Sequence, residues 1–169
     1  MPPLDNAICT AWKTNNRVNV YLVEHLPKEV WEAQVPGIPR RTIRAMAAHL
    51  HNARCRWIRT LGEEHGIRVP RRVDQYKVKP KELVAALERS SEGLLALLKL
   101  GCEQGGELPA TALYTWRNLP LDVGHVLTYF VAHEAHHRGQ IVMAARQLGY
   151  RMPELTGGIW QWTKLARES

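Results

Sequence analysis

Four long segments of this chain repeat their apolar residues with the period of an α-helix, and this repetition limits the possible folds more than any other feature. The segments run from about residue 4 to 26, from 41 or 42 to 63, from 80 to 100 and from 122 to 149. Alternating β-branched runs, which are typical of strands, are nearly missing. The sequence therefore predicts an all-α protein, a four-helix bundle with a short C-terminal helical segment over residues 157–169.

Individual residues indicate where these helices begin and end. Pro80 suits the first turn of a helix. Proline has no main-chain N–H, and in the first turn that N–H would have no partner within the helix. Asp122 is suited to cap the start of the last helix. Gly101 is expected to end the third helix and Gly149 the fourth, as glycine often does.

The length of the chain predicts a single domain over residues 1–169. With 45% hydrophobic residues, the chain can build a sizeable core. Two connections, residues 64–79 and 101–121, are longer than most loops, so we expect them to shape a site.

Cysteine usage and the apolar runs predict a cytoplasmic protein. The three cysteines, Cys9, Cys55 and Cys102, are widely spaced and odd in number, which does not suit a disulfide framework. The N-terminal residues lack the pattern of a signal peptide. No apolar run reaches the ~18 residues that a membrane span needs, so no membrane partner is expected.

The formal charge of +7 permits an acidic partner without identifying one. The arginines are spread over several segments, and we expect them to form solvated helix faces and one basic loop. Nucleic-acid binding is therefore not expected.

Two histidines of the last helix, His133 and His137, fall within its apolar stripe. At about 100° per residue, the residues within about 40° of His137 are Val126, Phe130, His133, Ile141, Ala144 and Leu148. Imidazoles four residues apart on one helix face can converge on a single metal ion. The alternative is a pair of core histidines that bond to a hydroxyl or to water.

A two-histidine site needs further ligands, and the second helix offers His49 and His51. Each lies about 100° from the centre of that helix's apolar face, on opposite sides. Periodicity alone does not choose between them.

The same stretch also satisfies the metalloprotease pattern H-E-x-x-H, with His133, Glu134 and His137. The extended form of that motif fails at Gln140 and Met143, and no β-sheet is expected beside the helix. We therefore disfavour a protease.

Two segments, MAAHLHNARCRW and LPLDVGHVLTYFVAHEAHHRGQI, resemble the DinB/YfiT-like family. In the second segment, the resemblance rests on a histidine pair four residues apart that is followed by Arg-Gly-Gln. With the four-helix layout, the resemblance covers nearly the whole chain. It implies a bundle that holds a divalent metal ion through His49, His133 and His137, and so chooses His49 over His51. It also implies a homodimer. Imidazole ligands suit zinc or nickel.

Three histidine ligands with exchangeable positions are typical of catalytic metal sites. Related family members include thiol-dependent transferases and isomerases, so we expect a metal-dependent enzyme of that type, or a hydrolase, that acts on a small molecule. The alternative is a non-catalytic interaction or stress-response bundle that retains the histidine cluster.

Two further residues are weak candidates for a catalytic role. Glu134 is expected to be a partly exposed helix residue, with proton acceptance as the alternative. Arg138 is expected in a surface ion pair, with binding of an anionic substrate as the alternative.

Overall fold

The computed structural model describes residues 4–169 and confirms the all-helical prediction. Its four long helices are α1 (Leu4–His25), α3 (Ile43–Gly62), α4 (Pro80–Glu103) and α5 (Val123–Gln147). The short elements are α2 (Lys28–Glu32), the 3-10 turn η1 (Glu63–His65), α6 (Pro153–Gly158) and α7 (Trp162–Leu165). Three short elements, α2, η1 and most of α6, lie outside the predicted helical segments. Val30 and Trp31 of α2 pack into the core.

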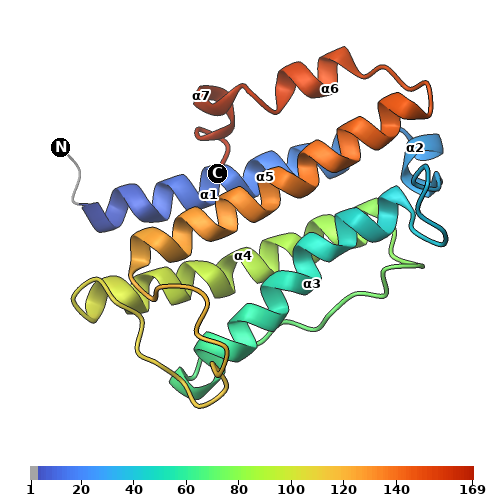
Figure 1. Ribbon diagram of the computed structural model, residues 1–169. Helices are drawn as coiled ribbons and strands as arrows, with labels where there is room; N and C mark the ends of the chain where they lie inside the picture. The colour runs from blue at the N-terminus through green and yellow to red at the C-terminus, as the bar shows by residue number, and fades with distance from the viewer. Residues whose placement is uncertain (1–3) are drawn as a thin grey trace.

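The long helices form a bundle in which α1 and α3 each pack against both α4 and α5 (Figure 1). The chain runs in one direction through α1 and α5 and in the opposite direction through α3 and α4 (Figure 1). Because α3 and α4 run the same way, the connection over residues 66–79 has to return along the length of the bundle. The connection over residues 104–122 instead folds across one end, towards the last turn of α3 (Figure 1).

Side chains at the predicted starts cap the helices. The Asp122 carboxylate accepts a hydrogen bond of 3.0 Å from the His125 N–H, which confirms its role at the start of α5. The Thr42 hydroxyl accepts one of 3.1 Å from the Ala45 N–H at the start of α3. Pro80 is the first residue of α4, as predicted.

The expected helix end at Gly101 is wrong, because α4 continues to Glu103. Gly101 is buried inside the helix, where a β-carbon would lie 2.6 Å from Val123 Cγ2. The chain turns instead at Gly105 and Gly106, which both adopt positive φ angles. Gly101 is therefore a packing residue rather than a cap.

Apolar side chains fill the bundle in two clusters, one towards each end. The first contains Leu22, Ile43, Leu50, Leu87 and Ile141, and the second contains Trp12, Ile58, Leu97, Val126 and Phe130. The residues between them on the same helices are buried and polar: Asn15, Asn19, His51, Arg54, Ser90, Glu134, His137 and Arg138. A polar layer thus crosses the middle of the bundle.

The C-terminal segment forms α6 and α7, which both contact α1. Within residues 4–169, no helix combines the length and the apolar character that crossing a membrane requires.

Candidate metal centre

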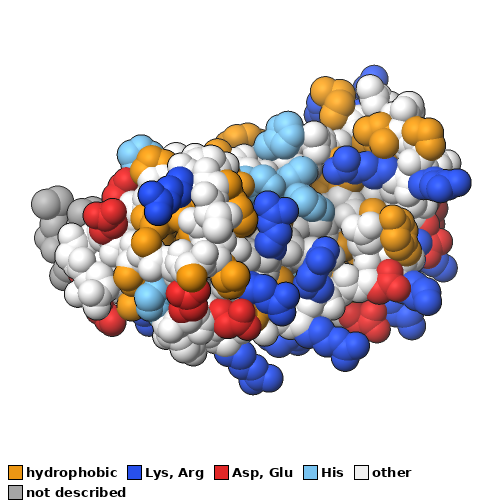
Figure 2. Space-filling model, turned by 60° about the horizontal axis from the view of Figure 1, so that its bottom comes forward, with side chains coloured by type: hydrophobic (Ala, Val, Ile, Leu, Met, Phe, Trp, Pro, Cys, Tyr) orange, Lys and Arg blue, Asp and Glu red, His pale blue; other side chains and the backbone are white. Residues whose placement is uncertain are grey.

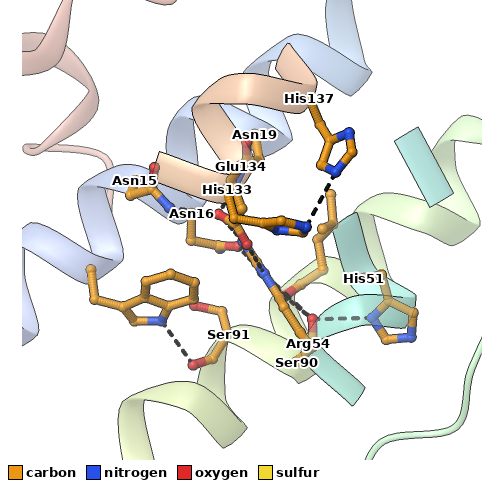
Figure 3. Close-up of polar contacts among 12 residues, drawn as sticks. Asn15, Asn16, Asn19, His51, Arg54, Ser90, Ser91, His133, Glu134 and His137 are labelled. Atoms are coloured by element: carbon orange, nitrogen blue, oxygen red, sulfur yellow. Dashed lines mark hydrogen bonds and ion pairs between the residues drawn. The ribbon is translucent and has the colours of Figure 1, made fainter. Parts of the chain in front are cut away.

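Three imidazoles from two helices meet at one side of the polar layer. His49 lies on α3, and His133 and His137 lie one turn apart on α5. One ring nitrogen from each can be chosen so that all three atoms lie within 4.8 Å of one another. His133 Nε2 and His137 Nε2 are 3.2 Å apart (Figure 3).

These separations fit a single divalent ion. Metal–nitrogen bonds of ~2.1 Å place neighbouring ligand atoms ~3.0 Å apart at right angles and ~3.4 Å apart at the tetrahedral angle. The His133–His137 pair falls between these values. The His49 ring centroid lies 4.6 Å from that of His137, and one His49 ring nitrogen lies within 4.8 Å of a ring nitrogen of each of the other two histidines.

A hydrogen bond fixes the orientation of one imidazole. His137 Nδ1–H donates to Gln140 Oε1 at 2.9 Å, and the Gln140 amide donates to His136 Nε2 at 2.8 Å. His137 Nε2 is therefore left without a proton, and its lone pair points towards His133. Such a partner on the far ring nitrogen is usual for metal-binding histidines.

All three imidazoles are held in the neutral form that binds metal. Burial lowers the pKa of His137 to about 4, and the hydrogen bond that His137 donates to Gln140 opposes this effect. Burial also lowers the pKa of His49 and of His133, and neighbouring charges add to this effect at His49. The histidine lone pairs are thus available at neutral pH.

Glu134 is fully buried, so the expectation of a partly exposed residue is wrong. Its carboxylate lies behind His133 and forms an ion pair of 2.6 Å with Arg54 Nε (Figure 3). Asn15 and Asn19 each donate a hydrogen bond of 2.6 Å to Glu134 Oε2. Both oxygens are therefore occupied on the side away from the metal centre, which argues against proton acceptance from a substrate.

Arg138 is buried as well, and the expected surface ion pair is wrong. Its guanidinium donates to the side-chain oxygens of Asn15 and Asn19, at 3.1 and 2.7 Å. Burial lowers the pKa of Arg138, and the charge of Glu134 opposes this effect. Arg138 and Glu134 thus belong to one buried network, joined through the two asparagines.

His51 lies apart from the cluster of His49, His133 and His137. Its Nδ1 is 3.0 Å from the Ser90 hydroxyl, and its Nε2 is 3.0 Å from the main-chain oxygen of Arg71. Both ring nitrogens are therefore occupied by structural contacts, and His51 is fully buried.

Aromatic rings form one wall beside the histidines. Tyr129 stacks on His133 with 5.9 Å between the ring centroids, and Trp57 packs edge-on against Tyr129 at 5.2 Å. Trp116, from the 104–122 connection, packs against Trp57 at 6.0 Å. Sequence reasoning did not find Tyr129, although it lies one helical turn before His133, which is the spacing that brings side chains together.

Three neutral imidazoles on a partly open surface suit a catalytic rather than a closed structural metal site. The metalloprotease reading is not supported, because the Glu134 carboxylate that would serve as its base is bound to Arg54.

A family model described as the DinB family matches residues 1–168. No curated protein and no solved structure is significantly similar to the chain.

Proposed function

The chain belongs to the DinB family, and from this premise we propose that it is a metal-dependent enzyme acting on a small molecule. His49, His133 and His137 would hold a divalent ion, zinc or nickel, because neutral imidazoles suit both. The proposed reaction is of the thiol-dependent transferase or isomerase type, with hydrolysis as a second possibility. The observation that carries the proposal is the convergence of these three side chains from two separate helices.

A bound ion of this kind would lower the pKa of a thiol or water molecule and so supply a nucleophile at neutral pH. The chain's own residues provide the surroundings. Gln140 orients the ring of His137. His49 and His133 are only partly buried, so a substrate can approach from solvent. Tyr129 and Trp57 offer an apolar wall for the organic part of that substrate.

Metal analysis of the purified protein tests the ligand assignment. After reconstitution with zinc or nickel and removal of excess ion, we expect about one ion per chain in the wild type. The His133→Ala/His137→Ala variant should retain less than about a tenth of that amount, because one remaining imidazole binds weakly. A His65→Ala/His125→Ala variant is the matched control, since both residues are exposed and lie outside the cluster. Equal metal content in all three proteins would refute the assignment.

A turnover assay separates the enzyme from the non-catalytic alternative. The metal-loaded protein is incubated with a low-molecular-weight thiol and the electrophile 1-chloro-2,4-dinitrobenzene, and thioether formation is followed by absorbance. We expect a rate that depends on the metal and that is lost in His49→Ala. A protein that binds metal but does not turn over across a panel of thiols and hydrolysable esters would favour the interaction role.

We also propose that the protein is a homodimer. Met143 on α5 and Trp160 beyond α6 are large apolar side chains with 55% and 76% of their surface exposed, and both line one groove. Light scattering of the wild type should give twice the chain mass, and a Met143→Glu/Trp160→Glu variant should give the chain mass. A wild type that remains monomeric at its highest soluble concentration would refute this.

A further inference from the structure

A cleft of about 1170 Å³ lies between α3, α4 and the returning connection. Its charged lining consists of Arg56 and Arg59 on α3, Arg89 on α4, Arg68, Arg71 and Arg72 on the connection, and the two acids Glu63 and Glu92. Six arginines against two glutamates give the lining a formal charge of +4. Residues that are far apart in the sequence thus gather around one hollow.

These guanidinium groups are largely without acidic partners. Within residues 4–169, Arg59 forms an ion pair, with Glu63 at 3.8 Å, and the other five arginines of the cleft form none within 4 Å. Holding like charges around one hollow costs free energy, which an anionic ligand would offset. Guanidinium groups bind phosphate and carboxylate oxygens in a bidentate manner.

One wall of the cleft is held in place by buried side chains of α3. His51 binds the main-chain oxygen of Arg71 at 3.0 Å. Asn52 accepts from the Val73 N–H at 3.0 Å and donates to the Val73 oxygen at 3.1 Å. The arginines on this connection are therefore presented from a fixed main chain, which lowers the entropy lost on binding.

From these contacts we infer that the cleft binds a small organic molecule that carries at least two phosphate or carboxylate groups. The arginines on opposite walls of the cleft would bind different anionic groups of this molecule. Ile67, Val69, Pro70 and Ala96 also line the cleft, and they supply contacts for a carbon skeleton. The volume is close to that of ordinary ligand pockets.

The shape and lining of the cleft suit such a molecule better than a nucleic acid. The arginines surround a hollow rather than form an extended stripe, and no aromatic side chain lines it for base stacking. The inference goes beyond the proposed metal chemistry and does not depend on it, because none of the three histidine ligands lines the cleft.

The cleft and the metal centre nevertheless lie on neighbouring parts of one face. Arg56 follows His49 by seven residues, which is about two helical turns on the same side of α3. Its guanidinium lies 5.8 Å from the ring centroid of Trp116, which packs on the aromatic wall. Figure 2 shows Lys and Arg side chains gathered on a face that also exposes histidines.

Calorimetric titration of the full chain with inorganic tripolyphosphate and with citrate tests the inference and distinguishes phosphate from carboxylate ligands. We expect saturable binding of at least one of the two anions. The variant Arg68→Gln/Arg72→Gln/Arg89→Gln should weaken that binding by about tenfold or more, because each lost guanidinium removes charged hydrogen bonds. The matched control, Lys13→Gln/Lys99→Gln/Arg151→Gln, removes three exposed positive charges outside the cleft and should change binding by less than about twofold at physiological salt.

The same titration on His133→Ala/His137→Ala separates this site from the metal centre. Unchanged affinity is expected, and a loss would show that the anion binds at the histidines and overturn the inference. Equal weakening by the two charge variants, or no saturable binding of either anion, would also overturn it. So would a DNA duplex that binds more tightly than both anions and depends on the same three arginines.

Discussion

The buried Glu134 carboxylate is the residue on which the polar layer depends most. It faces Arg54 at 2.6 Å and, through two asparagines, a second buried arginine, Arg138. Removing one partner of a buried ion pair leaves the other charge without compensation, which typically costs about 3–5 kcal/mol. Glu134→Gln should therefore lower the free energy of unfolding by about that amount, as measured by urea denaturation of the metal-free protein.

The matched control for this change is Glu24→Gln, at the exposed ion pair with Arg17. Exposed pairs contribute about 0–1 kcal/mol, so this variant should stay close to the wild type. If both variants lowered the free energy of unfolding by the same small amount, the buried network would not stabilise the fold as predicted.

The cysteines should differ in reactivity because of their burial. Burial raises the pKa of the Cys55 thiol to about 11, whereas Cys9 lies in a partly exposed position. At pH 8 only about one Cys55 thiol in a thousand would then be ionised, and only the thiolate reacts readily. Iodoacetamide at pH 8 should label Cys9 first and Cys55 last, as measured by peptide mass spectrometry. Labelling in denaturant is the control, where the difference should vanish; early labelling of Cys55 in the native protein would contradict the burial.

At the scale of the helices, glycines on α4 and α5 should respond in opposite ways to a methyl group. In Gly101→Ala the added β-carbon would lie 2.6 Å from Val123, and overpacking should cost about 1–3 kcal/mol despite the better helix propensity of alanine. In Gly139→Ala no atom lies within 4 Å, so the propensity gain of up to about 1 kcal/mol should remain. Thermal unfolding measures both changes, and a stabilised Gly101→Ala would show that α4 and Val123 are not in tight contact.

The buried face of α5 explains how far the sequence could predict the site. The apolar stripe correctly located Val126, Phe130 and Ile141 in the core. However, Glu134 and Arg138 are buried too, so the true face is rotated by about 40° towards them. A pattern of apolar residues cannot include charged residues that pair across the bundle, because their partners lie on other helices. This is why Glu134 and Arg138 were wrongly expected near the surface.

The histidine cluster was predictable only in part. The spacing of His133 and His137 indicated a shared face, but periodicity did not choose between His49 and His51, and the family resemblance did. The structure gives the physical difference: His51 has both ring nitrogens occupied, whereas His49 lies with its ring beside those of the other two histidines. Neither fact can be read from one helix alone.

For the whole molecule, the lowered pKa values of the buried histidines make stability depend on pH. Burial lowers the pKa of His137 from 6.5 to about 4, and also lowers that of His49, His51 and His133. Below pH 6.5 the unfolded chain takes up protons that the folded protein does not, so acid favours unfolding. The contribution of these neutral histidines to the free energy of unfolding is thus complete above pH 6.5 and is lost as the pH falls towards about 4.

The free energy of unfolding of the metal-free protein should therefore fall by about 1–3 kcal/mol between pH 7 and pH 4.5 through these groups. Urea denaturation at a series of pH values measures it. A His137→Gln variant should show a shallower dependence, because it lacks the imidazole whose pKa burial lowers to about 4. An identical slope in both proteins would contradict this assignment.

The sequence did not predict the direction of the chain through the bundle. The periodicity of apolar residues determines neither which helices are neighbours nor which run parallel. The long 64–79 connection was expected only to shape a site. It is long because it joins the end of α3 to the distant start of α4 (Figure 1). It also lines the arginine cleft.

The anchoring of that connection by His51 and Asn52 has a consequence for digestion by proteases. Residues 66–79 contain several sites for trypsin, among them Arg68, Arg71 and Arg72, in a stretch almost without helix or strand. Cleavage requires the backbone to detach and enter the enzyme's groove as an extended strand, and the bonds at Arg71 and Val73 oppose this. This irregular, highly basic segment should thus resist limited trypsin treatment for as long as its hydrogen bonds to His51 and Asn52 remain intact.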